Sequence, residues 1–283
     1  MIRPNFPQLE GRLMYHYTSE EAVLGIIKQD MIVLQPTKAD CLDDTTEGKE
    51  IYEHLQAACN ELFAAGAITQ EQYQQIIELK DIEKHSLVYP SWLHNNKTDI
   101  CSAAFKECVA YEMSFCKVVD DEGMWEDYAH QQCCLHFNMD SLSQWFPQNI
   151  DCSMEIREIT YYDVEKVKEI KELILDSITS EDYLQKIEDG INYNCYFYKG
   201  KEEFSGEKEI RFLCVVPKNP TQTTYIEKVE PGRKPYIEVE ISSIHELFVI
   251  RGVTIAKNAD YKRVKQYLAT CNPHIEVFRK GEN

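Results

Sequence analysis

Two long stretches with helical patterns interrupt the short, strand-like apolar segments of this chain. The helical blocks cover residues 47–84 and 164–190, and most of the expected strands lie outside them. A regular alternation of strand and helix would predict a parallel sheet, but the elements expected here do not alternate in this way. The sequence therefore predicts an α+β fold with a core sheet of mixed or antiparallel strands.

The 283 residues are long enough for one large domain, which we expect to span residues 1–283. An acidic helical insertion is expected within it at about 43–98. Thr69 and Gln72 give the capping-box pattern at the start of the second helix of this insertion. Thr18 and Glu21 give the same pattern directly after a strand at 13–17. The other expected strands are MIVL, ICSAAF, CCLHF, EIREITYY, YNCYFY, EKEIRFLCVV, YIEVEI, LFVIRGVTI and HIEVF.

Charge and cysteine content restrict the classes of partner. The formal net charge is −18, and acidic residues clearly outnumber basic ones between residues 40 and 130. Such a surface repels phosphate backbones, so nucleic acid is not the expected partner.

No apolar run reaches the roughly 18 residues that span a bilayer, and the N-terminal residues do not have the pattern of a secretory signal. The 11 cysteines are odd in number and irregularly spaced, which predicts thiols in a reducing compartment, the cytoplasm.

Most familiar site motifs are missing from the sequence. It has no C-x-x-C, no glycine-rich phosphate loop and no G-x-S-x-G, and we expect no metal. Cys133 and Cys134 are adjacent, so on a strand their side chains point to opposite faces. A cysteine nucleophile paired with His130 or His136 is an alternative that no motif in the sequence supports.

Three features remain, and each also has a purely structural interpretation. His16 stands between two tyrosines at the end of a strand. Trp125 and Tyr128 lie three residues apart, on one face of an expected helix, where core packing is the usual explanation. Glu207, Glu209 and Arg211 alternate along a strand, so their side chains point one way. That face could be a solvated salt bridge or an arrangement that keeps a carboxylate ionised and oriented.

In this order, the motifs resemble those of a bacterial family of domains of unknown function. That family has a YHYTS-like start, an acidic N-D-x-x-E loop, an MWxxYAxxHxGxCIxF segment, a V-x-Y strand, and an aromatic–lysine pair with an E-x-E-x-R block. The corresponding segments here are residues 15–19, 43–47, 124–129, 134–137, 159–161, 198–199 and 207–211. The resemblance covers roughly residues 13–252. Gln132 stands where the family has a glycine, so the approach to the following strand is expected to differ.

The family is in turn similar to ADP-ribosyltransferases with a His-Tyr-Glu triad. This resemblance implies an ADP-ribosyltransferase-like sheet, NAD as the substrate, and a catalytic carboxylate. We expect this carboxylate to be Glu209 rather than Glu207, because Glu209 lies deeper in the strand. The resemblance further implies His16 as the ribose ligand and Tyr128 or Tyr17 as the nicotinamide-stacking ring. The other candidate NAD-binding residues are Thr18, Trp125 and Arg211. Arg211 would either bind the diphosphate or orient Glu209.

The resemblance implies an ADP-ribosyltransferase, or an NAD glycohydrolase, that acts in bacterial conflict or phage defence. The acceptor would be a protein or a small molecule. The alternative is a non-catalytic module on the same fold that binds a nucleotide or a protein, with the helices at 47–84 as its contact surface. A binding module would not need the Glu207/Glu209 pair.

Overall fold

The computed structural model describes residues 12–29, 31–42, 51–79, 108–145, 152–161, 164–199, 206–217, 225–242 and 249–281. The chain divides into two compact units. The first contains residues 1–35, 114–150 and 238–283, and the second contains residues 36–113 and 151–237. The prediction of a single domain over residues 1–283 stays a prediction that unfolding experiments can test.

The first unit is built on a mixed sheet covered by helices. Its elements are β1 (Leu13–Thr18), α1 (Glu20–Ile26), β2 (Ile27–Lys28), β3 (Met31–Leu34), α4 (Glu122–Asp127), β6 (Cys133–Asn138), α5 (Met139–Trp145), β11 (Val239–Ser242), β12 (Ile250–Ile255), α9 (Tyr261–Cys271) and β13 (Glu276–Arg279). Strand β5 (Cys108–Cys116) contributes its last residues to this unit.

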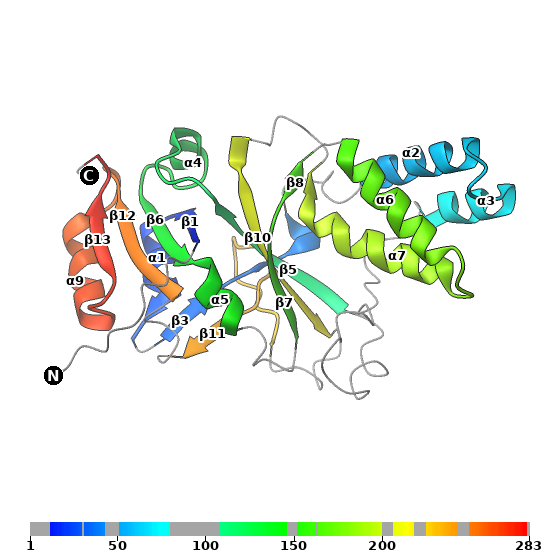
Figure 1. The fold of residues 1–283 in the computed structure, drawn as a ribbon. Coiled ribbons are helices and arrows are strands. Elements are labelled where there is room, and N and C mark those ends of the chain that lie inside the picture. Colours follow the sequence, from blue (N-terminus) through cyan, green and yellow to red (C-terminus); the bar gives the residue numbers. More distant parts are fainter. Residues whose placement is uncertain are drawn as a thin grey trace, which may run out of the picture. The chain divides into compact units, whose positions relative to one another are not determined.

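Strand order in this unit is β13-β12-β6-β1-β5. Only the β12–β13 pair is parallel among the described pairings of these strands, and the neighbouring pairs β12–β6, β6–β1 and β1–β5 are antiparallel. The predicted α+β fold with a mixed sheet is therefore confirmed. Helix α9 lies along β12 and β13, and a second sheet has the order β11-β3-β2 (Figure 1).

Helix α1 begins one residue later than the capping-box pattern predicted. Ser19 is its N-cap, and the Ser19 hydroxyl accepts a hydrogen bond from the Ala22 amide. Thr18 is instead the last residue of β1, where it pairs with Cys133 of β6. The extended pairing of Thr18 decides the boundary, because two adjacent hydroxyl residues satisfy the capping preference equally well.

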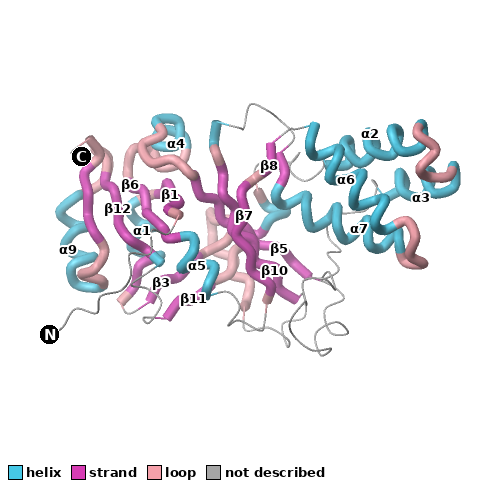
Figure 2. Tube along the Cα trace, viewed as in Figure 1, coloured by secondary structure: helices cyan, strands magenta, loops and turns pink. Residues whose placement is uncertain are grey.

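The second unit contains a group of helices and a group of strands (Figure 2). Its elements are β4 (Thr37–Lys38), the 3-10 turn η1 (Ala39–Cys41), α2 (Ile51–Ala64), α3 (Gln70–Glu78), the first part of β5, β7 (Ser153–Glu158), β8 (Thr160–Tyr161), α6 (Val164–Ser177), α7 (Tyr183–Asn194), η5 (Cys195–Phe197), β9 (Tyr198–Lys199) and β10 (Glu209–Pro217). Strand β10 lies between β5 and β7, and β8 pairs with β9 in a separate two-stranded sheet.

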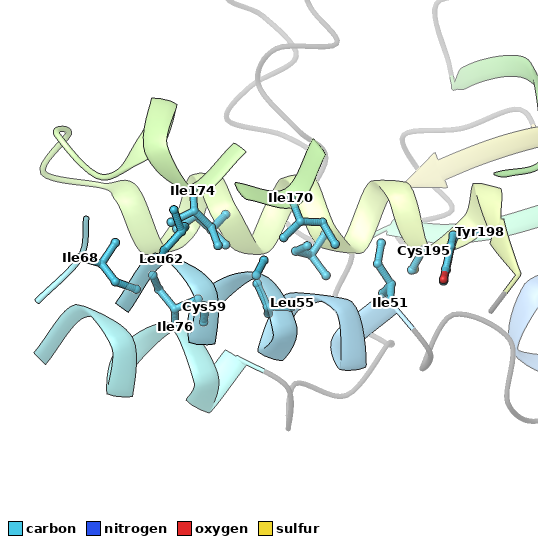
Figure 3. Packing of buried hydrophobic residues seen from close by; sticks show 13 residues of the cluster. Ile51, Leu55, Cys59, Leu62, Ile68, Ile76, Ile170, Ile174, Cys195 and Tyr198 are labelled. Carbon is cyan, nitrogen blue, oxygen red and sulfur yellow. The ribbon is translucent and has the colours of Figure 1, made fainter. Parts of the chain in front are cut away.

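Helices α2, α3, α6 and α7 share one apolar core (Figure 3). On α2, Ile51, Leu55 and Leu62 follow helical spacing, and they are buried against residues such as Ile170 and Ile174 of α6. The predicted capping box of Thr69 and Gln72 is confirmed at the start of α3. The range 43–98 predicted as an insertion therefore contains two helices that pack on α6 and α7. Residues 43–50 and 80–98 of that range, and the expected strand ICSAAF, lie outside the described residues.

The helical pattern predicted over 164–190 is confirmed and forms two helices, α6 and α7. The prediction that the segment YNCYFY is a strand is wrong over most of its length. The segment completes α7, continues as η5 and gives only Tyr198 to β9. The reason is visible in the spacing of Ile191, Cys195 and Tyr198, which keep the helical period and join the same buried core.

Within the part of the chain that the structure describes, no helix has both the length and the apolar character needed to cross a membrane.

Replacing Ile174 with Ala should lower the free energy of unfolding by about 2–5 kcal/mol, because it opens a cavity in the core shared by these helices. Urea unfolding followed by circular dichroism measures the change. Leu175→Ala is the matched control, since Leu175 is the next residue on α6 and is exposed. The control should change the free energy by less than about 1 kcal/mol, and equal losses for the two variants would contradict the assigned packing.

Candidate functional site

The predicted site residues belong to two units of the chain. His16, Tyr17, Thr18, Trp125 and Tyr128 lie in the first unit. The acidic pair Glu207 and Glu209, together with Arg211, lies in the second. Each group is described within its own unit.

Neighbouring residues of β1 point to opposite faces of the sheet, and this separates His16 from Tyr17. Tyr17 packs in a cluster with Trp125, Cys116 and Cys134. His16 instead lies near the ring of Phe115 on β5, with the ring centroids 5.6 Å apart. The YHY segment therefore supplies two different environments.

The ring of His16 is held in one orientation. Its Nδ1 lies 2.9 Å from the carbonyl oxygen of Ser114. A carbonyl can only accept, so Nδ1 carries the proton and donates it, and Nε2 is left as an acceptor. Burial lowers the pKa of His16, and the bond to Ser114 acts in the opposite direction. The imidazole is therefore neutral at pH 7, with a fixed tautomer.

Trp125 and Tyr128 are three residues apart but have different surroundings. Trp125 is fully buried on α4, and its ring meets the ring of Tyr17 edge-on, with centroids 5.1 Å apart. Tyr128 caps the end of α4 and has 51 % of its surface exposed. The Tyr17 hydroxyl donates to the Val118 carbonyl and accepts from the Asp121 amide. Only Tyr128 among these three rings presents a large exposed surface.

The backbone just before Gln132 has an unusual conformation. His130 and Gln131 both have positive φ, at 48° and 57°. The side-chain oxygen of Gln132 accepts a hydrogen bond from the Glu20 amide, 2.8 Å away. A left-handed pair of residues is thus followed by a side chain that holds the start of α1.

The acidic pair in the second unit lies where β10 begins. Lys208 has a φ of 47°, so the extended strand starts only at Glu209 and Glu207 lies in the preceding turn. Glu209 and Arg211 share one face of β10, as alternation predicted. That face is buried rather than solvated, with Arg211 only 1 % exposed. The interpretation of a solvated salt bridge is therefore wrong for these two residues.

Arg211 contacts two carboxylates and a backbone carbonyl. Its Nε and NH2 atoms lie 2.9 Å from Oε1 of Glu209. Its NH1 atom lies 2.9 Å from Oε2 of Glu112, on β5, and 2.7 Å from the carbonyl oxygen of Tyr196. These contacts use the guanidinium to hold Glu209 and Glu112 in place.

Lys199 connects Glu209 to Glu207. The Lys199 ammonium lies 2.8 Å from Oε2 of Glu209 and 2.6 Å from Oε2 of Glu207. The five groups thus form a row of alternating charge in the order Glu112, Arg211, Glu209, Lys199, Glu207. Three carboxylates face two cations, so this row carries one more negative than positive charge.

Glu209 is ionised in this environment. Burial by itself opposes the charged form, but the charge of Arg211 and then that of Lys199 outweigh it and lower the pKa of Glu209 to about 2. Burial likewise acts to lower the pKa of Lys199, and Glu209 and Glu207 reverse this and raise it above its ordinary value. Both partners are therefore charged across the physiological range.

Three members of this arrangement were not predicted as site residues. Lys199 and Tyr161 appeared only as parts of motifs, and Glu112 was not singled out. Tyr161 accepts a hydrogen bond from the Glu209 amide, 2.7 Å away. Glu112 had one available signal, because it is the one charged residue in the strand CVAYEMSFC and a carboxylate inside such a strand needs a cation.

The alternative of a cysteine nucleophile gains no support from these contacts. His136 Nε2 lies 2.9 Å from the Thr254 hydroxyl, its ring stacks on Phe278, and burial lowers the pKa of His136 to about 4. Burial also raises the pKa of the Cys134 thiol, which disfavours the thiolate. His130 faces the carbonyl of Glu126. Among the described residues, no group of three or more His, Cys, Asp or Glu could hold a metal ion.

A small cavity of about 70 Å³ lies elsewhere in the second unit. It is lined by Ile51, Lys166, Glu169, Ile170, Leu173, Ile191 and Asn194. None of the predicted site residues is part of this lining.

Comparison with known proteins gave no match to any family model, curated protein or solved structure. The family resemblance and the activity that it implies therefore stay predictions.

Replacing Arg211 with Met should lower the free energy of unfolding by about 3–5 kcal/mol, because Glu209 and Glu112 would stay buried without this countercharge. Chemical denaturation at pH 7 measures the loss. Arg233→Met is the control, since Arg233 pairs with Glu230 at the surface of the same unit and should cost at most about 1 kcal/mol. A similar small loss for Arg211→Met would contradict the assigned role.

The stability of the protein should fall as the pH is lowered from about 4.5 towards 2, in part because of Glu209. The pKa of Glu209 is about 2 in the folded chain and near 4.5 when unfolded, so the unfolded chain binds the extra proton in this window. Glu209→Gln should be less stable than the parent at pH 7 and should lose less stability on acidification. Unfolding at stepped pH values tests this, and parallel pH curves for parent and variant would refute it.

Proposed function

We propose that this chain is an ADP-ribosyltransferase-like enzyme that cleaves the nicotinamide–ribose bond of NAD. The ADP-ribose would pass to a protein or small-molecule acceptor, or to water in an NAD glycohydrolase. The observation that carries the proposal is the buried, ionised carboxylate of Glu209, paired with Glu207 in a row of charges whose sum is negative.

The chemistry of this bond suits such a group. Cleavage passes through an oxocarbenium-like state in which positive charge develops on the ribose, as in glycoside hydrolysis. A fixed negative charge in a buried site stabilises that state without reorganising at the moment of reaction. Glu209 remains our proposed catalytic carboxylate, and Glu207, with 20 % of its side chain exposed, is the more accessible member of the pair.

The contacts of the other predicted residues support different roles. The neutral His16 has Nε2 as an acceptor, which suits a ribose hydroxyl as donor. Tyr128 is our proposed stacking ring because of its exposure, whereas the contacts of Tyr17 and Trp125 support a packing role. Arg211 already contacts three oxygen-bearing groups, which supports orientation of Glu209 rather than binding of the diphosphate. Thr18, at the end of β1, stays a candidate ligand.

The proposal includes a cytoplasmic location and a role in bacterial conflict or phage defence. Nine of the cysteines in the described part of the chain are free thiols, which supports a reducing compartment. The role in conflict rests on the family resemblance alone.

A non-catalytic nucleotide or protein-binding module is the second candidate. One observation favours it, namely that both carboxylate oxygens of Glu209 already contact cations. Such a group can serve to hold strands together instead of meeting a substrate. NAD turnover separates the two candidates.

The purified parent protein should release nicotinamide from NAD, and Glu209→Gln should reduce the release by at least about a hundredfold, because it removes the charge and keeps the shape. Chromatographic measurement of nicotinamide over time tests this. Glu207→Gln is the matched variant in the adjacent turn and identifies which carboxylate is needed.

Loss of turnover in Glu207→Gln, with turnover kept in Glu209→Gln, would transfer the catalytic role to Glu207. His16→Phe should lower turnover without unfolding the chain. No release by the parent, and no rise of its melting temperature with NAD, would refute the enzyme proposal and favour the binding module.

A further inference from the structure

Lys199 occupies a position between two carboxylates of like charge. Its ammonium is within hydrogen-bond distance of Oε2 of both Glu207 and Glu209, and its side chain is 12 % exposed. Two carboxylates that share one small cation are close enough to repel each other strongly. Without a cation between them, such a pair tends to take up a proton or to separate.

Arg211 cannot take over this role from where it lies. Its contacts with Glu209 go to Oε1, the other oxygen of that carboxylate. Its NH1 atom is directed to Glu112 and to the carbonyl of Tyr196. Arg211 therefore neutralises Glu209 from the side away from Lys199.

The turn that carries Glu207 needs an anchor. Lys208 next to it has a φ of 47°, a conformation that costs a non-glycine residue of the order of 1 kcal/mol. The contact with Lys199 ties this turn to β9, in the two-stranded sheet of β8 and β9.

Lys199 is itself well placed by β9. It pairs with Tyr161 of β8 in the parallel register, and the Tyr161 hydroxyl accepts the amide of Glu209. Two facing residues of one small sheet thus hold Glu209, one through its backbone and the other through its side chain. The same sheet holds Glu207 through Lys199.

We propose that Lys199 is a positioning residue that holds the Glu207 carboxylate against Glu209 and keeps the pair together and charged at the start of β10. The inference rests on the function proposed above, in which this pair acts on the ribose of NAD. Lys199 itself touches the carboxylates and acts through them.

The test compares Lys199→Met, Lys199→Arg and the double variant Lys199→Met with Glu207→Gln. The first measurement is a pH titration of the Glu209 carboxyl carbon by NMR, with Glu209→Gln used to assign the signal. Lys199→Met should shift the Glu209 titration upwards by at least about one pH unit, because the carboxylate keeps its burial and loses one cation. Lys199→Arg should restore most of the shift.

The double variant removes one of the two repelling carboxylates. Its Glu209 titration should return part of the way to that of the parent. If Lys199→Met alone does not fold, the double variant should fold, because Arg211 still neutralises the remaining carboxylate. An unshifted Glu209 titration in Lys199→Met, or a double variant that is no better than the single one, would overturn the proposal.

The second measurement is the pH dependence of nicotinamide release. The acidic limb of the parent profile should move upwards in Lys199→Met by a similar amount, so the loss of turnover relative to the parent should be small at pH 6 and should grow towards about tenfold as the pH approaches that limb. A loss of turnover with an unchanged profile would mean that Lys199 only stabilises the fold and would refute its positioning role. If the parent releases no nicotinamide, the enzyme proposal fails, and the carboxyl titration still decides the role of Lys199.

Discussion

The buried guanidinium of Arg211 is the constraint on which the second unit depends. A charge with almost no access to water is tolerated only where opposite charges and hydrogen-bond acceptors surround it. Those partners come from three separate elements, because Glu112 lies on β5, Glu209 lies on β10 and the Tyr196 carbonyl belongs to η5. A one-residue slip of β10 would bring Ile210 to this position and leave Glu112 without the guanidinium, because Glu209 moves together with Arg211 on the same strand. The ion pair of Arg211 and Glu112 therefore specifies the register of β10 against β5 as well as the contact of these two strands.

The same arrangement determines the electrostatic character of the carboxylate pair. Arg211 and Lys199 together keep Glu209 ionised far below neutral pH, so its charge does not depend on a substrate to stabilise it. As a consequence, the two cations already compensate part of the negative charge of Glu209. Glu207 is the most exposed of the three acids in the row. Both candidate functions can use this one network, and they differ in whether its carboxylates meet a substrate.

Local patterns predicted much of the fold and the face shared by Glu209 and Arg211, because strand alternation and capping chemistry act over a few residues. The strands β6, β10, β12 and β13 and the capping box at Thr69 follow from such patterns. Burial of Glu209 and Arg211 could not be predicted in the same way, since it depends on Glu112 and Lys199, which are distant in sequence. The failure at YNCYFY has a related cause, because the helical core shared by α2, α3, α6 and α7 extends the helical period through aromatic residues that favour strands locally.

The YHYTS segment shows how adjacent residues of one motif come to serve different purposes. His16 and Tyr17 point to opposite faces of β1, so they cannot line the same surface of the sheet. The Tyr17 hydroxyl accepts a hydrogen bond from the amide of Asp121, which is the N-cap of α4, and donates one to the carbonyl of Val118. It thereby fixes the start of the short helix that ends at Tyr128. If Tyr128 stacks on nicotinamide as proposed, Tyr17 contributes to binding without touching the ligand, and its loss would loosen the position of Tyr128 while leaving the imidazole of His16 in place.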